Sequence, residues 1–261
     1  MKKLFLILTL FSIFSCSHDS QEDNLNSNFN SVKNQMLQRS AENQIGYENA
    51  KIFAKKYSDS LSIILDKIED NGLKQSNAID YSNDNLNTIN KEVINQLGYE
   101  GSFEFSSEID NSIINLEDIE KLDLSEREIF YLTKLYESYL NKDDNQLINI
   151  TNNYINEVKT NKELESLSMC FALIDVNRNL FLENYTLKAD ANCARAALKD
   201  AVYSGCGGMI RGAIRGGLTG LVIGGNPITG GAGAVVGAVS QGLIGFIGGG
   251  IEGYVRCKTG L

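Results

Sequence analysis

The chain has 261 residues, of which 43% are hydrophobic, with 24 glycines, one proline, one histidine and no tryptophan. This length allows one sizeable domain or two small ones. Residues 17–190 carry 16 basic and 31 acidic residues, whereas residues 191–261 carry six basic and two acidic residues and 20 of the glycines. The acidic part is unsuited to nucleic-acid binding, so no nucleic-acid partner is expected, and the asymmetry predicts a boundary near residue 188.

The first sixteen residues have the organisation of a targeting segment. Two lysines precede an apolar run from Leu4 to Phe14, which is too short to span a bilayer stably. The run ends in Ile13-Phe14-Ser15-Cys16, which resembles the lipobox of bacterial lipoproteins. The resemblance implies that Cys16 becomes the lipidated first residue of the mature chain; an ordinary secretory signal is the alternative. In both cases we expect the protein to be exported.

Residues 17–30 are polar and acidic and cannot bury apolar surface, so we expect a disordered tether here. This N-terminus is similar to that of lipoproteins of the Bacteroidota. In those proteins acidic residues after the cysteine accompany display on the cell surface. The resemblance therefore implies anchoring to lipid through Cys16 at the outer membrane or cell surface.

Residues 31–187 are predicted to form an acidic helical domain, because apolar residues recur with a period of 3.6. Ser125 and Glu128 have the spacing of a capping box, which predicts a helix start. The predicted core stripes are Phe53, Tyr57, Leu61, Ile64 and Ile68; Ile129, Leu132, Tyr136 and Tyr139; Leu147, Ile150, Tyr154 and Val158; and Leu164, Leu167, Phe171 and Ile174. The segments Asn71–Asn85 and Gly98–Asn115 are predicted to be irregular, with a short extended piece at Phe103–Phe105.

Residues 188–261 are predicted to form a helical hairpin in which small residues recur every four positions. Residues four apart share one face of a helix, and a bare glycine face lets two backbones approach closely. We call this pattern the glycine zipper. The predicted helix-packing glycines are Gly208, Gly212, Gly216, Gly220 and Gly224 in the first helix and Gly233, Gly237, Gly245, Gly249 and Gly253 in the second. The turn is expected between Gly224 and Gly231, because Pro227 lacks a backbone donor and glycines flank it. The predicted fold class is therefore all-α.

The hairpin carries no charged residue between Arg215 and Glu252, and it is rich in valine, isoleucine and leucine. This composition predicts an element that contacts membrane lipid over residues 205–253 and associates with itself, which could produce a homo-oligomer. Arg211 and Arg215 would then lie at the interface and extend toward headgroups. The rival interpretation is a soluble hairpin buried in the protein, because apolar runs alone do not separate a core from a membrane segment.

Residues for catalysis, metal binding or cofactor binding are scarce. The single histidine, His18, lies in the predicted tether, which excludes a Ser-His or Cys-His pair and a histidine metal site. Pairs such as Glu117-Asp118 and Asp143-Asp144 lack calcium-loop spacing and are interpreted as solvated faces. No Walker sequence occurs at Gly224–Gly231. We therefore expect no catalytic residues, no metal and no cofactor, and we do not expect the protein to be an enzyme.

Four cysteines remain after Cys16, an even number in a chain expected to be exported. If residue 223 faces residue 232 in an antiparallel hairpin, residue 198 lies opposite Cys257, and Cys193 lies about 7 Å away along the axis. A similar register for the preceding helix places residue 205 opposite Cys170. The predicted disulfides are therefore Cys170–Cys206 and Cys193–Cys257, with four free thiols as the alternative.

The C-terminal run, from Ala189-Asp190-Ala191 through its Gly-Ala repeats, resembles the glycine-zipper tails of uncharacterised Bacteroidota lipoproteins. Its last 60 or so residues are also similar in composition to membrane-active bacteriocins, which implies a membrane-active effector. Those bacteriocins carry a double-glycine export leader, whereas this chain has a lipoprotein signal. The alternative function is a non-toxic envelope lipoprotein, with a structural or binding role, whose hairpin packs on its own helical domain.

Overall fold

The computed structural model describes residues 45–71, 75–101, 114–181, 189–223 and 226–260. The predicted signal peptide with Cys16, the predicted tether and the predicted extended piece at Phe103–Phe105 lie outside these residues. The predicted all-α fold is confirmed. The elements are α3 (Tyr47–Asn71), α4 (Gln75–Gln96), α5 (Leu116–Glu120), α6 (Glu126–Asn141), α7 (Asp144–Val158), the 3-10 helix η1 (Lys162–Leu167), α8 (Ser168–Val176), the 3-10 helix η2 (Arg178–Phe181), α9 (Ala189–Ile214), the π-helical turn η3 (Arg215–Thr219), the strands β1 (Leu221–Ile223) and β2 (Asn226–Ile228), and α10 (Gly230–Thr259).

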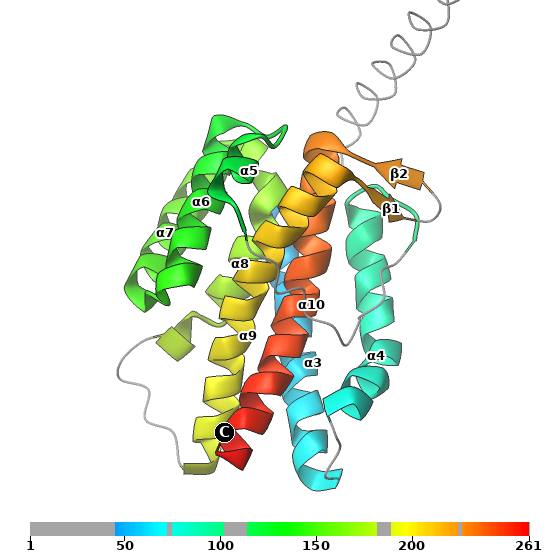
Figure 1. Cartoon of the computed structure of the whole chain (residues 1–261), viewed down its shortest axis with the longest axis vertical. Coiled ribbons are helices and arrows are strands. Elements are labelled where there is room, and N and C mark those ends of the chain that lie inside the picture. Colours follow the sequence, from blue (N-terminus) through cyan, green and yellow to red (C-terminus); the bar gives the residue numbers. More distant parts are fainter. Residues whose placement is uncertain (1–44, 72–74, 102–113, 182–188, 224–225, 261) are drawn as a thin grey trace, which may run out of the picture. The chain divides into compact units, whose positions relative to one another are not determined.

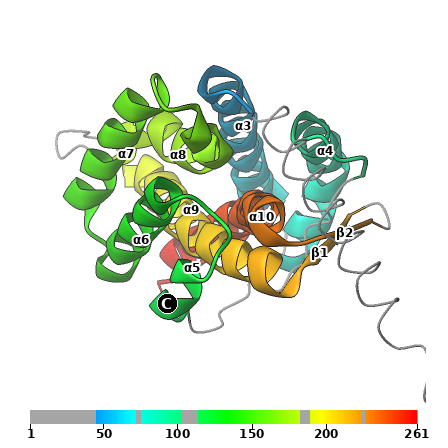
Figure 2. The ribbon, with the colours of Figure 1, turned by 90° about the horizontal axis from the view of Figure 1, so that it is seen from above.

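The two C-terminal helices lie side by side in the middle of the other helices (Figures 1 and 2). α3 and α4 pack against α10, and α6 packs against α9. α7 contacts α6, α8 and η1, on the side of the hairpin opposite to α4 (Figure 2). The hairpin is thus the central layer of this helical unit, because every other long helix except α7 packs directly on it.

The predicted amphipathic stripes supply much of this core. The stripes that begin at Phe53, Leu147 and Leu164 are buried at every predicted position. Ser125 caps α6 as predicted: its hydroxyl accepts a hydrogen bond from the Glu128 backbone, and the Glu128 side chain accepts one from the Ser125 backbone. The centre of this part of the core is aromatic, since the rings of Tyr131, Tyr154 and Phe171 contact one another.

Three local predictions require correction. Asn71–Asn85 was predicted to be irregular, but α4 already begins at Gln75, because Leu86, Val93 and Ile94 give it a buried face that outweighs the poor helix propensity of its asparagines. The stripe from Leu164 to Ile174 belongs to two elements, η1 and α8, instead of one helix. In α6, Leu132 and Tyr136 are buried as predicted, but Tyr131 and Leu135 complete the buried face in place of Ile129 and Tyr139, which are only partly buried.

The connection between the two hairpin helices also differs from the prediction. α9 ends at Ile214, and β1 and β2 pair antiparallel with Leu221 opposite Ile228. Gly220 does not belong to a helix face: its φ is +82°, a left-handed conformation that favours glycine, and it ends the π-helical turn. Gly224 lies outside the described residues. The first helix is therefore shorter than predicted, and a small β-hairpin with Pro227 in an edge strand replaces the loop.

The described residues on both sides of the boundary predicted near residue 188 belong to one compact unit. The hairpin packs on both parts of the acidic region, because α10 contacts α3 and α4 near its start and both α9 and α10 contact α8 near its end. The change of composition near residue 188 therefore separates the acidic helices, which cover the hairpin, from the glycine-rich helices α9 and α10, which form it.

Candidate functional site

The predicted glycine zipper forms the contact between α9 and α10. A Cβ atom at Gly212 would lie 1.9 Å from the carbonyl oxygen of Gly237, and one at Gly237 would lie 2.0 Å from the carbonyl oxygen of Gly212. Gly216 and Gly233 face each other in the same reciprocal way, at 2.0 and 2.2 Å. No side chain fits between backbones at these distances, so these four glycines are required by the packing.

The zipper continues toward the chain ends with other small residues. Gly208 lies against the carbonyl of Gln241, and Gly245 lies against that of Ser204. Farther along, Gly249 accommodates the side chain of Ser204, and Gly253 accommodates that of Asp200. The predicted stripe on α10 is therefore confirmed as a packing surface, and on α9 it extends through Ser204 and Asp200.

A second set of glycines was missed by the periodicity argument, because its members lie outside the two stripes. Gly207 on α9 and Gly217 in η3 make room for Tyr139 and Leu122, and Gly242 and Gly250 on α10 make room for Met209 and Leu61. Three of these side chains, all except Met209, come from outside the hairpin. The glycines of this hairpin therefore serve packing on the rest of the protein as well as packing of α9 on α10.

The open end of the hairpin is closed by a disulfide between Cys193 and Cys257, as predicted, with a Cα–Cα distance of 5.4 Å. The register differs from the predicted one, because Gly212 faces Gly237 and Gly216 faces Gly233. Extending this register along antiparallel helices places Cys257 opposite residue 192, so that Cys193 lies only one residue, about 1.5 Å, away along the axis. The β-hairpin at the other end keeps the register of the two helices, with Leu221 opposite Ile228.

The second predicted disulfide, Cys170–Cys206, is wrong for this structure. Both cysteines are free and buried. Burial raises the pKa of the Cys170 thiol to about 12 and raises that of Cys206 further, where the neighbouring Cys170 adds to the effect. These thiols are therefore protonated hydrophobic side chains at neutral pH. The two cysteines are neighbours, as the register used for α8 and α9 predicts, but they form no disulfide.

Arg211 does not occupy the interfacial position that a membrane hairpin would give it. Its side chain is buried, with 9% exposure, and its guanidinium lies 5.9 Å from the ring centroid of Tyr139 on α6. Its Nε atom has no hydrogen-bond partner among the described residues. Arg215, one turn later, is exposed. A cation–π contact inside the protein thus replaces the predicted headgroup contact of Arg211.

The membrane prediction can be compared with the length and burial of the helices. Among the residues that the structure describes, α10 alone is long and apolar enough to cross a membrane. However, 89% of its most apolar stretch is buried inside the protein. At its C-terminal end, Tyr254 and Lys258 donate hydrogen bonds to Glu69 on α3, at 2.5 and 2.6 Å. These contacts lower the pKa of the Glu69 carboxyl, because both donors favour its charged form.

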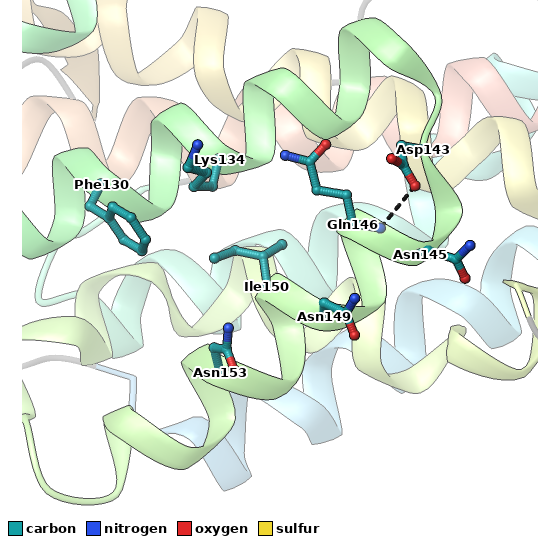
Figure 3. Close-up of a pocket in the computed structure, with 8 residues that line it drawn as sticks. All are labelled: Phe130, Lys134, Asp143, Asn145, Gln146, Asn149, Ile150 and Asn153. Carbon is teal, nitrogen blue, oxygen red and sulfur yellow. Dashed lines mark hydrogen bonds between the residues drawn. The ribbon is translucent and has the colours of Figure 1, made fainter.

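A surface groove of about 420 Å³ lies between α6 and α7 (Figure 3). The two helices form a tight antiparallel pair: Lys142 adopts a left-handed conformation with φ 46°, and Asp143 caps α7 by accepting a hydrogen bond from the backbone of Gln146 at 2.9 Å. The groove is lined by Phe130 and Lys134 from α6 and by Asp143, Asn145, Gln146, Asn149, Ile150 and Asn153 from the α7 side. Four of these residues carry side-chain amides.

The aromatic end of this groove is held by an ion pair. Phe130 is 39% exposed, and the guanidinium of Arg127 lies 4.8 Å from its ring centroid. Arg127 donates two hydrogen bonds to the carboxylate of Glu157 on α7, one of them at 2.7 Å, and Tyr131 donates a third at 2.8 Å. These donors lower the pKa of the Glu157 carboxyl. The exposed ring is therefore positioned by contacts that join the two helices.

Within the described residues, no group of three or more histidine, cysteine, aspartate or glutamate side chains could hold a metal ion. His18 lies outside those residues. No protein-family model, no curated protein and no solved structure matches the chain. The hairpin and the α6–α7 groove are consequently the features on which a functional argument can be built.

Proposed function

We propose that the protein is an exported lipoprotein, anchored through Cys16, whose helical unit is a structural or binding module of the cell envelope. The observation that carries this proposal is the burial of α10: the apolar helix that could reach a membrane is covered by the protein's own helices. Because its glycine face contacts α9, that face is also not available to pair two copies while the hairpin stays closed. No enzymatic activity is part of this proposal.

The lipobox supports the anchor, and the anchor supports the location at the outer membrane or cell surface. The test is metabolic labelling with a fatty acid, compared between the wild-type chain and Cys16→Ala. Label in the wild type and its loss in the variant support a lipoprotein. An unlabelled wild-type chain that is nevertheless exported would reduce the proposal to a secreted protein.

A second candidate, a bacteriocin-like membrane-active effector, is favoured by the span-like length and composition of α10. For this function α3 and α4 would have to separate from α10, which requires breaking the Glu69 contacts with Tyr254 and Lys258. Leakage of a dye from liposomes of anionic lipid measures this directly. Leakage caused by the full chain, and increased by Glu69→Gln, would support the effector. No leakage with either protein would support the envelope module, in which α10 stays covered by the other helices.

A further inference from the structure

We propose that the α6–α7 groove binds an extended, uncharged peptide segment of a partner protein. The proposal deepens the binding role suggested above, but it uses no property of the anchor or of the hairpin. Three observations carry it: the spacing of the amides on α7, their lack of partners within the described protein, and a partly aromatic lining whose charged side chains are already engaged.

The spacing of the amides matches an extended backbone. Asn145, Asn149 and Asn153 follow one another at four-residue intervals, so they form one stripe along α7 with a rise of about 6.0 Å per interval. In an extended peptide, backbone groups that face the same way repeat about every 6.6–6.8 Å. Each asparagine offers one acceptor and two donors. A side-chain amide can therefore pair with both the N–H and the C=O of a peptide unit, three times in succession.

The side-chain amides of these asparagines have no structural role within the described part of the protein. All three are exposed, and among the described residues no hydrogen bond is made by their side-chain amides. Asn149 and Asn153 lie in the interior of α7, where asparagine is a poorer helix former than alanine. Asn152, on a neighbouring face, differs because it accepts a hydrogen bond from Arg178 at 2.8 Å. The stripe thus carries unused hydrogen-bonding capacity on a rigid helix.

The charges and apolar surface of the groove define the segment that it fits. The Lys134 ammonium is already bound by Glu137 at 2.6 Å, and Asp143 already accepts a hydrogen bond from the backbone of Gln146 at 2.9 Å. Both charged side chains of the lining are thus engaged within the protein, which favours an uncharged segment. Figure 3 shows the ring of Phe130 pointing into the groove at the end nearer Asn153, with Ile150 in the middle. An apolar side chain of the peptide would pack on this ring, which Arg127 holds in place.

An oligosaccharide also uses amides and an aromatic ring, but the repeat of paired donors and acceptors favours a peptide backbone. The test is calorimetric titration of the full chain with the blocked peptide Ac-Thr-Val-Thr-Leu-Thr-Val-Thr-NH2. Two control ligands are titrated in the same way. The first is the same peptide with alternate backbone amides methylated, which removes backbone donors, and the second is the oligosaccharide maltoheptaose. Side-chain amide signals in NMR spectra of the same samples locate the contact.

We expect the blocked peptide to bind and to shift the amide signals of Asn145, Asn149 and Asn153, and the methylated peptide to bind at least fivefold more weakly. Asn149→Ala and Asn153→Ala should each weaken binding about fivefold, and Asn95→Ala, an exposed asparagine of α4, should leave it unchanged. The alanine variants keep the fold because alanine is the better helix former. Absence of peptide binding, insensitivity to Asn149→Ala, or binding of maltoheptaose alone would overturn the proposal, while the anchor and the covered hairpin would stand.

Discussion

Single glycines control the distance between α9 and α10. Gly212→Ala would place a methyl group 1.9 Å from the carbonyl oxygen of Gly237, where neither backbone can yield easily. Although alanine improves helix propensity by about 1 kcal/mol, the overlap should dominate, and we expect a net loss of at least about 2 kcal/mol. The measurement is the free energy of unfolding in urea.

The control for this prediction is Gly46→Ala, because a Cβ atom there meets nothing within 4 Å. Its stability should change by less than about 1 kcal/mol, which covers the loss of a favourable residue near the start of α3. Equal effects of the two substitutions would show that the glycine face is not a backbone contact.

The two buried cysteines give a second prediction at this scale. Cys170 and Cys206 should resist alkylation in the native protein, because their thiols are buried and their pKa values are raised. Both should react fully in denaturant, and peptide mapping without reduction should recover Cys193–Cys257 alone. Recovery of a Cys170–Cys206 disulfide would restore the pairing expected from the sequence and contradict the structure.

At the scale of elements, the disulfide fixes the open end of the hairpin. The bond joins residues separated by 64 positions, so its removal frees a long loop in the unfolded chain. The chain-entropy model assigns about 4 kcal/mol to a loop of this length. We expect a variant with both Cys193→Ser and Cys257→Ser to lose about 2–5 kcal/mol of stability.

Reduction provides the control for that variant. A reducing agent should destabilise the wild-type protein by a similar amount and leave the double variant unchanged, with circular dichroism as the probe of unfolding. An effect of the reductant on the double variant, which retains the thiols of Cys170 and Cys206, would point to a bond absent from the structure.

The pairing of α6 with α7 should depend on pH through Glu157. Its pKa is lowered in the folded protein, mainly by hydrogen bonds from Arg127, so the folded state favours the carboxylate. This contribution is present above the pKa of an unfolded glutamate and is lost as the pH falls through the lower folded pKa, so the acidic window in question lies between these two pKa values. Glu157→Gln should therefore reduce the loss of thermal stability over this window, whereas Glu126→Gln, at the exposed start of α6, should not.

Helices could be predicted from the sequence where their buried residues recur with a regular period or where a local motif marks a helix end. The stripe through Phe53 and Tyr57 and the capping box at Ser125 depend on local chemistry, and both are present. The first half of α4, from Gln75 to Asn85, was missed because its asparagines disfavour a helix, and only burial of the helix against its neighbours offsets them. The α6–α7 groove had no signal in the sequence, since single exposed side chains such as Phe130 and Asn149 form no motif until two helices meet.

At the scale of the whole molecule, the apolar hairpin could be predicted, but its environment could not. An uncharged run from Arg215 to Glu252 fits both a lipid bilayer and a protein interior. The choice depends on α3, α4, α6 and α8, whose amphipathic faces are far away in the sequence and cover α9 and α10. The same argument explains Arg211, whose buried contact with Tyr139 no local pattern indicates.

The central claim is that the hairpin is held inside the protein and that membrane attachment depends on Cys16. Extraction of membranes with alkaline carbonate, applied to Cys16→Ala and to the wild-type chain, tests it most directly. We predict that the wild-type chain remains in the membrane pellet and that Cys16→Ala, with its hairpin covered, is recovered entirely in the supernatant. Retention of exported Cys16→Ala in the pellet, together with loss of that retention when Leu243 and Ile247 of α10 are replaced by Asn, would show an inserted hairpin and contradict the account.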